Sequence, residues 1–381
     1  MQTSPRSTAF LVLLALLGIG AFAWLRQASA PAGGEPRPSV IGALEVPGPK
    51  TGSQAVKGDA VPAATAQETA FARCHVAWRR AQEPRLQALR ERADADSMLT
   101  HALLVGLVHP EESSGLNQAG STATWLASAA AAAPDDPEIA WFHMLHCAES
   151  AGCDRKVALD RFLAMEPDNL AGWMFAISDA YGKGAEAERA AFAGASRAIH
   201  YDARDGDGFV RRFNALRNAP LPAECTGAEV EAEWMAMMVS DIPLTPEHMA
   251  LVPVIAVIAA EMRPYVALRD ACRRRDDQPM PQARVVACRS IMEKVADGRT
   301  LIDQIIGTGL MTELSRGARD HALWQERMRG LRWLQQRQME LPFDAEALEQ
   351  RWSGDEVAVT KRQLADVGLW PPPPDWHPEA P

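Results

Sequence analysis

A helical-hairpin unit that recurs about every 33 residues constrains the fold of this 381-residue chain more than any other sequence feature. The first copy contains residues 133–141 and the second residues 166–173, so that Pro134 and Pro167 stand 33 positions apart. A weaker third copy spans residues 198–209 and has alanine in place of the proline. A unit of this length cannot bury its apolar face alone, so the pattern predicts stacked units that share one core.

The copies share a local chemistry that explains why a helix ends and another begins in each. The residue before a proline is pushed out of α geometry, so the preceding helix stops there. Asp136 can cap the next helix, and Pro137 suits its first position. Trp141 and Trp173 then lie about one turn inside the new helix and offer a large apolar ring to the neighbouring helix.

This pattern resembles the tetratricopeptide repeat over about residues 122–217. In that family a proline ends one unit and a tryptophan six residues later opens the next; Pro167 and Trp173 have this spacing, whereas Pro134 to Trp141 is one residue longer. The family's close-packing glycine is absent from both copies, where Leu145 and Ile177 stand. The resemblance implies a superhelical array of antiparallel helical hairpins with a concave binding surface, and it implies no catalytic residue.

Composition extends the all-α prediction to the rest of the chain. Ala, Leu, Glu, Arg and Met dominate, and runs rich in Val, Ile and Thr are scarce. The run over 249–260 is apolar almost all round, which predicts a central, buried helix. Apolar residues at three- and four-residue steps predict helices over 68–93, 98–108, 122–133, 229–239, 249–260, 265–275, 282–296, 301–314, 320–339 and 344–352.

The N-terminal segment predicts export. Arg6 precedes an uncharged apolar run of about 17 residues that ends at Leu25 and is at the short limit for spanning a bilayer. Ala28-Ser29-Ala30 has the small-residue pattern of a signal-peptidase site. An uncleaved signal anchor and a cleaved signal peptide both remain open. The first predicts a chain anchored in the inner membrane of a bacterial-type cell envelope and facing the periplasm, and the second a chain secreted to the periplasm.

Prolines and a Pro-, Gly- and Ala-rich stretch predict the domain organisation of the chain. Pro220 and Pro222 mark a boundary between two helical parts, and the Pro-, Gly- and Ala-rich stretch after the signal has no apolar period. We expect a signal anchor or signal peptide at 1–30, a flexible linker at 31–66, a repeat-like helical domain at 67–218, a C-terminal helical domain at 225–366 and a Pro/Trp tail at 367–381.

The six cysteines predict three disulfides, because the number is even and the chain carries an export signal. Two pairs flank turns between consecutive predicted helices, and the remaining pair would tie the first helix to the start of the second domain. Buried free thiols are the alternative in a reducing compartment. The predicted pairs are Cys147 with Cys153, Cys272 with Cys288, and Cys74 with Cys225.

The best metal candidate is the pair His143 and His146, which Cys147 and Cys153 could join as thiolates. Oxidised cysteines cannot ligate, so we predict no metal and no cofactor. A second candidate, the Asp-Gly-Asp-Gly run over 205–208, echoes a calcium loop but lacks oxygen ligands at the flanking positions, where Ala203 and Asn214 stand. A capped turn is the simpler interpretation of that run.

Two further features have no catalytic pattern. The arginines at 273–275 abut two aspartates and are interpreted as a self-neutralised turn, with an anionic-lipid contact as the alternative. Trp370 and Trp376 surround four prolines, and either fold back as a clasp or offer a polyproline ligand. The chain has no His-Glu-x-x-His, no Gly-x-Ser-x-Gly and no Walker A sequence.

The net charge of −10 argues against nucleic acid as a partner, because phosphate binding needs a basic face. We therefore expect an exported, membrane-tethered helical-repeat protein that acts as a protein- or peptide-binding scaffold in the cell envelope. The alternatives are a helical periplasmic hydrolase or metal-dependent enzyme near His143 and His146, and a purely structural envelope protein. No catalytic residue is assigned.

Overall fold

The computed structural model describes residues 69–109, 116–147, 153–181, 183–238, 241–261, 264–273, 280–341 and 344–378. Within these ranges the secondary structure is helical, with one isolated backbone bridge between Asn169 and His200 and no strand. The predicted signal segment and linker, residues 1–66, lie outside the described ranges. Over the part of the chain that is described, no helix has the length and apolar character needed to cross a membrane.

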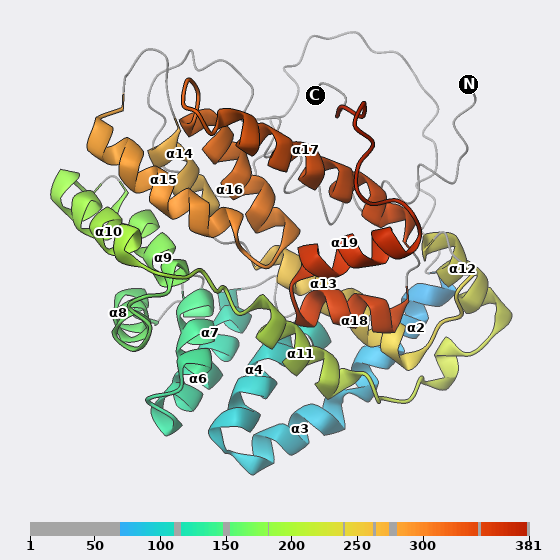
Figure 1. Ribbon diagram of the computed structural model, residues 1–381. Helices are drawn as coiled ribbons and strands as arrows, with labels where there is room; N and C mark the ends of the chain where they lie inside the picture. The colour runs from blue at the N-terminus through green and yellow to red at the C-terminus, as the bar shows by residue number, and fades with distance from the viewer. Residues whose placement is uncertain are drawn as a thin grey trace, which may run out of the picture.

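The helices follow one another with short connections (Figure 1). In chain order they are α2 (Ala70–Ala81), α3 (Glu83–Arg92), α4 (Ala95–Val108), α6 (Leu116–Ala132), α7 (Pro137–Cys147), α8 (Arg155–Met165), α9 (Leu170–Ala180), α10 (Ala185–Arg197), α11 (Asp205–Leu216), η1 (Ala223–Cys225), α12 (Ala228–Met238), α13 (Pro246–Ala260), α14 (Tyr265–Cys272), α15 (Gln282–Ala296), α16 (Leu301–Leu314), α17 (His321–Arg337), η2 (Gln338–Glu340), α18 (Ala345–Ser353) and α19 (Glu356–Asp366).

The sequence prediction is wrong at two helices. The single helix expected over 68–93 is two, α2 and α3, because Pro84 in the first turn of α3 lacks an N–H and its ring clashes with a carbonyl of the preceding turn. Helix α19 was not among the predicted helices, and it contains the β-branched residues Val357, Val359 and Thr360, which have a lower helix propensity. Asp355 caps α19 by accepting the Ala358 N–H at 2.9 Å, and Leu364 packs into the core.

Helix α13 is also less buried than expected. Leu251, Val254 and Ile258 lie in the core, but Ile255 and Val257 are only partly buried. The apolar residues on all sides of α13 are therefore not all buried, because the described neighbours of this helix cover one face.

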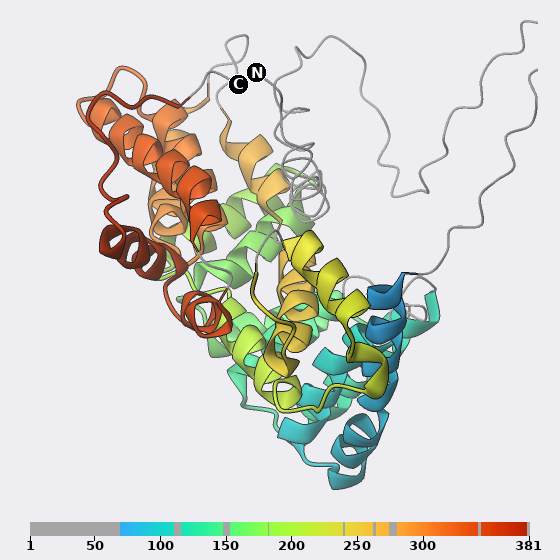
Figure 2. The ribbon, with the colours of Figure 1, turned by 90° about the vertical axis from the view of Figure 1, so that its right-hand side faces the viewer.

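Consecutive helices pack against each other from α3 to α10, and the remaining helices close a circuit (Figure 1). Helix α9 packs on α14, and α10 packs on α15. From α15, successive contacts join α16, α17, α19 and α18. Helix α18 packs on α11, and α11 packs back on α4. Turned by 90°, the molecule is elongated, with α17 and α19 at the upper left and α3 at the lower right (Figure 2).

The hydrophobic cores extend across the prolines at 220 and 222 that were expected to separate two domains. One core joins α2, α3 and α4 to α11, α12 and α13, and a second joins α9 and α10 to α14, α15 and α16. The repeat-like half and the C-terminal half are thus held together by shared apolar surface, whose burial is the main favourable contribution to folding.

The second and third repeat copies contact each other through their connecting loops. Asn169 is fully buried, and its amide makes four hydrogen bonds: Nδ2 donates to Glu166 Oε2 (2.7 Å) and Asp202 O (2.9 Å), and Oδ1 accepts from the Ala171 and Asp202 N–H groups (3.0 and 3.1 Å). An asparagine side chain has no further strong donor or acceptor to satisfy. This pairing sets the position of the 200–204 loop, which reaches the candidate site.

The six cysteines lie in the three predicted pairs at disulfide distance. Within the helical hairpins, one pair links the end of α7 to the start of α8 and another links α14 to α15; the third joins α2 to η1. The described part of the chain contains no free cysteine. The sulfur–sulfur distances are 2.10 Å for Cys74–Cys225, 1.95 Å for Cys147–Cys153 and 2.05 Å for Cys272–Cys288.

The Pro/Trp tail folds back on α17, which is the clasp alternative. The Trp333 indole N–H donates to the Leu369 carbonyl at 2.7 Å, and the Trp376 ring lies edge-on to Trp333 at 5.0 Å between centres. Arg329 donates to the carbonyls of Pro373 (2.9 Å) and Trp376 (3.2 Å). These contacts hold the tail across one side of α17.

Candidate functional site

In the candidate metal cluster of the sequence analysis, the two cysteines form a disulfide. Side-chain atoms of His143, Cys147 and Cys153 lie within 4.8 Å of one another. However, the two sulfurs are bonded to each other, which leaves His143, 3.4 Å from the Cys153 sulfur, as the one ordinary ligand. His146 faces elsewhere, with Nε2 at 3.3 Å from Glu261 Oε1, so the two histidines do not converge.

Glu261 belongs to a buried ion pair that has a structural role. Its partner Arg212, which is 1% exposed, also donates to the Leu103 carbonyl at 3.3 Å and lies over the Phe142 ring at 5.7 Å. Burial alone would raise the pKa of Glu261, but the charges of Arg212 and His146 lower it below its usual value. The pair therefore joins α11 to the loop after α13 and leaves no free base.

The run over 205–208 begins helix α11 and is not an open ligand loop. Arg204 precedes it in the left-handed conformation, with φ of 51°, and its N–H donates to Asp202 Oδ1 at 2.9 Å. The Arg204 guanidinium pairs with Glu166 and reaches Asp207 at 3.4 Å. The Asp202 carboxylate thus forms a turn before α11, and no side chain caps the helix at Arg204. Of the predicted 273–275 arginine turn, only Arg273 lies within the described ranges.

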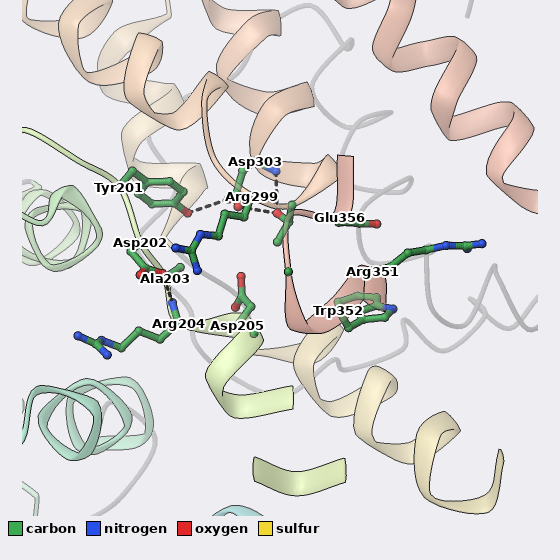
Figure 3. A pocket seen from close by; sticks show the side chains of 13 residues that line it. Tyr201, Asp202, Ala203, Arg204, Asp205, Arg299, Asp303, Arg351, Trp352 and Glu356 are labelled. Carbon is green, nitrogen blue, oxygen red and sulfur yellow. Dashed lines mark hydrogen bonds between the residues drawn. The ribbon is translucent and has the colours of Figure 1, made fainter. Parts of the chain in front are cut away.

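A small polar recess, here called the seam cavity, lies where the 201–206 loop meets the C-terminal helices (Figure 3). Its volume of about 20 Å³ has room for a single water, not for a substrate. The Arg351 side chain points away from it in Figure 3. The lining residues are Tyr201, Asp202, Ala203, Arg204, Asp205, Gly206, Arg299, Thr300, Asp303, Arg351, Trp352, Gly354 and Glu356.

Asp303 organises one side of the seam cavity. It is 1% exposed and lies in the first turn of α16, where the Thr300 side chain caps the helix. The hydroxyls of Tyr201 (2.7 Å) and Tyr265 donate to one carboxylate oxygen, and the Thr300 hydroxyl donates to the other. A carboxylate with these three donors is satisfied, so Asp303 joins the repeat loop to α14 and α16 and is not a free general base.

Glu356, at the start of α19, has the most unusual titration in this recess. Burial raises its pKa to about 7, and the charge of Asp303 adds to the shift, while the Leu301 N–H, which donates at 2.7 Å, and Arg351 oppose it. Such a pKa is typical of catalytic acids and bases. The seam cavity nevertheless offers no activated nucleophile and no space for a reacting group, so we assign it a structural, pH-sensitive role.

A second recess, here called the tail groove, is large enough for a ligand. Its volume is about 410 Å³, within the usual range of ligand sites. One face of α17 forms its floor, the tail forms one wall, and α16 and α19 contribute the rest. The lining residues are Gln304, Leu323, Glu326, Arg327, Arg329, Gly330, Leu331, Lys361, Trp370, Pro371 and Pro372.

The tail groove combines apolar walls with basic groups. Leu323 is 73% exposed, which is unusual for a leucine within a recess. Arg327 is paired with Asp297 at 2.9 Å, and Arg329 with Glu326 at 2.7 Å. Lys361 differs from these arginines, because its ammonium lies 5.5 Å from the Trp370 ring centre and forms no ion pair with a described carboxylate.

Comparisons with protein-family models, with curated proteins and with solved structures found no match. The interpretation of the site therefore depends on the geometry of this chain. The sequence analysis missed Asp303, Glu356, Leu323 and Lys361. Trp370 was the one residue whose sequence context indicated a site, because its position among prolines fits no core pattern. The other residues of both recesses come from helices that are distant in the sequence.

Proposed function

We propose that this chain is an exported, membrane-tethered helical-repeat scaffold that binds a protein or peptide partner in the cell envelope. The observation that carries the proposal is the tail groove, a preformed recess of about 410 Å³ with apolar walls and an exposed leucine. Concave, mostly apolar sites with a few polar groups are the usual form of a binding site. No nucleophile with an adjacent base lines this groove, so we propose binding and not catalysis.

A tetratricopeptide-like array is part of the proposal for residues 122–217. Two observations support it: successive helices from α6 to α10 pack in order, and the paired loops that contain Asn169 and Asp202 are separated by 33 positions. The tryptophan that opens a unit of the family has a counterpart in Trp141, which is buried against Phe162 and Phe175. The C-terminal helices α14 and α15 pack against α9 and α10 and so cover part of the array. We therefore place the partner in the tail groove and not on the array.

Export is supported by the cysteine pairs. Three disulfides in one chain are typical of an oxidising compartment and rare in the cytosol. With the N-terminal segment, they favour a chain that is anchored in the inner membrane and faces the periplasm, or is secreted there if the signal is cleaved. Non-reducing peptide mapping of envelope protein, with free thiols alkylated first, tests this compartment. Six alkylated thiols would contradict it.

Site-specific photocrosslinking in cells tests the binding function. A photoreactive residue at position 323 of the full-length chain should give one reproducible adduct with a single envelope protein, identified by mass spectrometry. The matched control is the same residue at position 286, because Val286 on α15 is also exposed, at 58%, and does not line the groove. An adduct pattern at 323 that equals the pattern at 286 would count against the proposal.

The enzyme alternative near His143 and His146 requires an open Cys147–Cys153 bond. Metal analysis of the purified protein, before and after reduction of its disulfides, separates the two readings. Stoichiometric metal in the protein as purified, together with free thiols at Cys147 and Cys153, would favour the enzyme.

A further inference from the structure

We propose that the tail groove takes an acidic peptide segment that carries an apolar anchor side chain. This inference rests on the binding function proposed above and names the chemistry of the partner. The evidence is the arrangement of one helix face, the charges around it and the fixed wall that the tail provides.

The floor of the groove is a single face of α17. Leu323, Arg327 and Gly330 are separated by four and three positions, so the three positions share one face of the helix. Gly330 is the low point of this face, and a Cβ there would lie 3.5 Å from the Trp370 ring. An apolar side chain of a partner would cover Leu323 and the Trp370 ring, removing both from water.

The charge around the groove favours a carboxylate. Three basic residues and one acidic residue line it, on a chain whose net charge is −10. Arg327 and Arg329 already have carboxylate partners, but Lys361 has the Trp370 ring. Burial lowers the pKa of Lys361, and the charge of Arg327 adds to the shift. A carboxylate beside Lys361 would offset the repulsion between these two cations.

The tail wall is preformed, and two of its three lining residues, Pro371 and Pro372, have no backbone N–H to donate. Trp333 and Arg329 hold the tail through the Leu369, Pro373 and Trp376 carbonyls. Residues 371 and 372 are prolines without N–H groups, so a partner cannot add to this wall as a hydrogen-bonded strand. Recognition must then come from apolar contact and from Lys361, and the rigid wall lowers the ordering cost of binding.

Fluorescence anisotropy with the full-length chain in a mild detergent tests the inference. The probe is a fluorescein-labelled peptide with one leucine flanked by glutamates, compared with the same peptide carrying glutamines. We expect the glutamate peptide to bind on the order of tenfold more tightly at low salt, with the difference shrinking at about 0.5 M salt.

Matched variants assign the effect to the groove. Lys361→Met keeps the aliphatic stem and should abolish the preference for glutamate. Arg362→Met removes the same charge from the neighbouring exposed position, outside the groove, and should leave the preference intact. Leu323→Ser should weaken both peptides on the order of fivefold, whereas Val286→Ser should not.

Three results would overturn the inference. They are equal affinity for the two peptides, equal effects of Lys361→Met and Arg362→Met, or displacement of the glutamate peptide by mixed micelles of detergent and anionic phospholipid that Lys361→Met no longer binds. The last result would assign the groove to a lipid. The photocrosslinking experiment at position 323 distinguishes these failures from a failure of the binding function, since an adduct forms there whatever the charge of the partner.

Discussion

Removing the Cys74–Cys225 disulfide should destabilise the protein more than removing either of the other two. A cross-link restricts the unfolded chain, and the restriction grows with the length of the closed loop. The sequence separations are 151 residues for Cys74–Cys225, 16 for Cys272–Cys288 and 6 for Cys147–Cys153. In the chain-entropy account, these loops correspond to about 5, about 3 and about 2 kcal/mol of free energy of unfolding.

The comparison between the two longest loops isolates the effect of loop length. Cys74, Cys272 and Cys288 are 0% exposed and Cys225 is 5% exposed, so replacing either pair by alanine removes similar buried surface. Cavity costs should therefore be similar, and the two double variants should differ by about 2 kcal/mol. Urea unfolding at 25 °C, followed by tryptophan fluorescence, measures this difference.

A different ranking would refute the reasoning. If the variants lacking Cys74–Cys225 and Cys272–Cys288 have equal free energies of unfolding, loop entropy is not the dominant contribution, and local packing around each bridge decides instead. Adding a reductant to the unaltered protein gives an independent check, since it should reproduce the combined loss.

Three further predictions concern single side chains. Glu356→Gln should remove a pH dependence of the free energy of unfolding. The pKa of Glu356 is raised from 4.5 to about 7 in the folded state, so the protonated carboxyl favours the folded state. This contribution is fully present below about pH 4.5 and is lost as the pH rises through 7, a change of at most about 3 kcal/mol. Urea midpoints at pH 5 and pH 8 should then differ less in the variant than in the unaltered protein, and an unchanged difference would contradict the assignment. Asn169→Ala should cost about 3 kcal/mol, since it leaves several buried groups without partners; a loss below about 1 kcal/mol, measured by urea unfolding, would mean that water replaces the amide. Gly307→Ala should cost about 1–3 kcal/mol, because its Cβ would lie 2.3 Å from the Ala296 backbone nitrogen. Gly309→Ala on the same helix would have its nearest contact at 3.5 Å, so it should be neutral or stabilising by up to about 1 kcal/mol. Thermal unfolding of the two variants compares these effects.

Helices with a clear apolar period and a defined start could be predicted from the sequence. Helices α15 and α16 have the expected bounds, and the Thr300 cap and the proline at 281 explain where each begins. The disulfide pairs were also predictable, because two of them close turns between consecutive helices and the third follows by elimination. In each case the information is local, within about one helical hairpin.

The parts that escaped prediction depend on contacts between distant residues. Helix α19 forms although its β-branched residues disfavour a helix, because Val357 and Leu364 pack against α16 and α17. The break between α2 and α3 was the opposite error, where a continuous apolar stripe concealed the effect of Pro84. Neither recess has a sequence motif, since each is lined from three or more segments.

The seam cavity and the tail groove are built from the same two helices, which explains how the fold positions the proposed site. Asp303 and Gln304 are consecutive in α16, yet the first lines the seam cavity and the second the tail groove. Helix α19 likewise begins with Glu356 in the seam cavity and places Lys361 in the tail groove. Because the bond from Tyr201 to Asp303, across 102 positions, holds α16 against the repeat-like half, the repeat loops support the groove without lining it. Contacts with the repeat-like half thus support the C-terminal helices that form the groove.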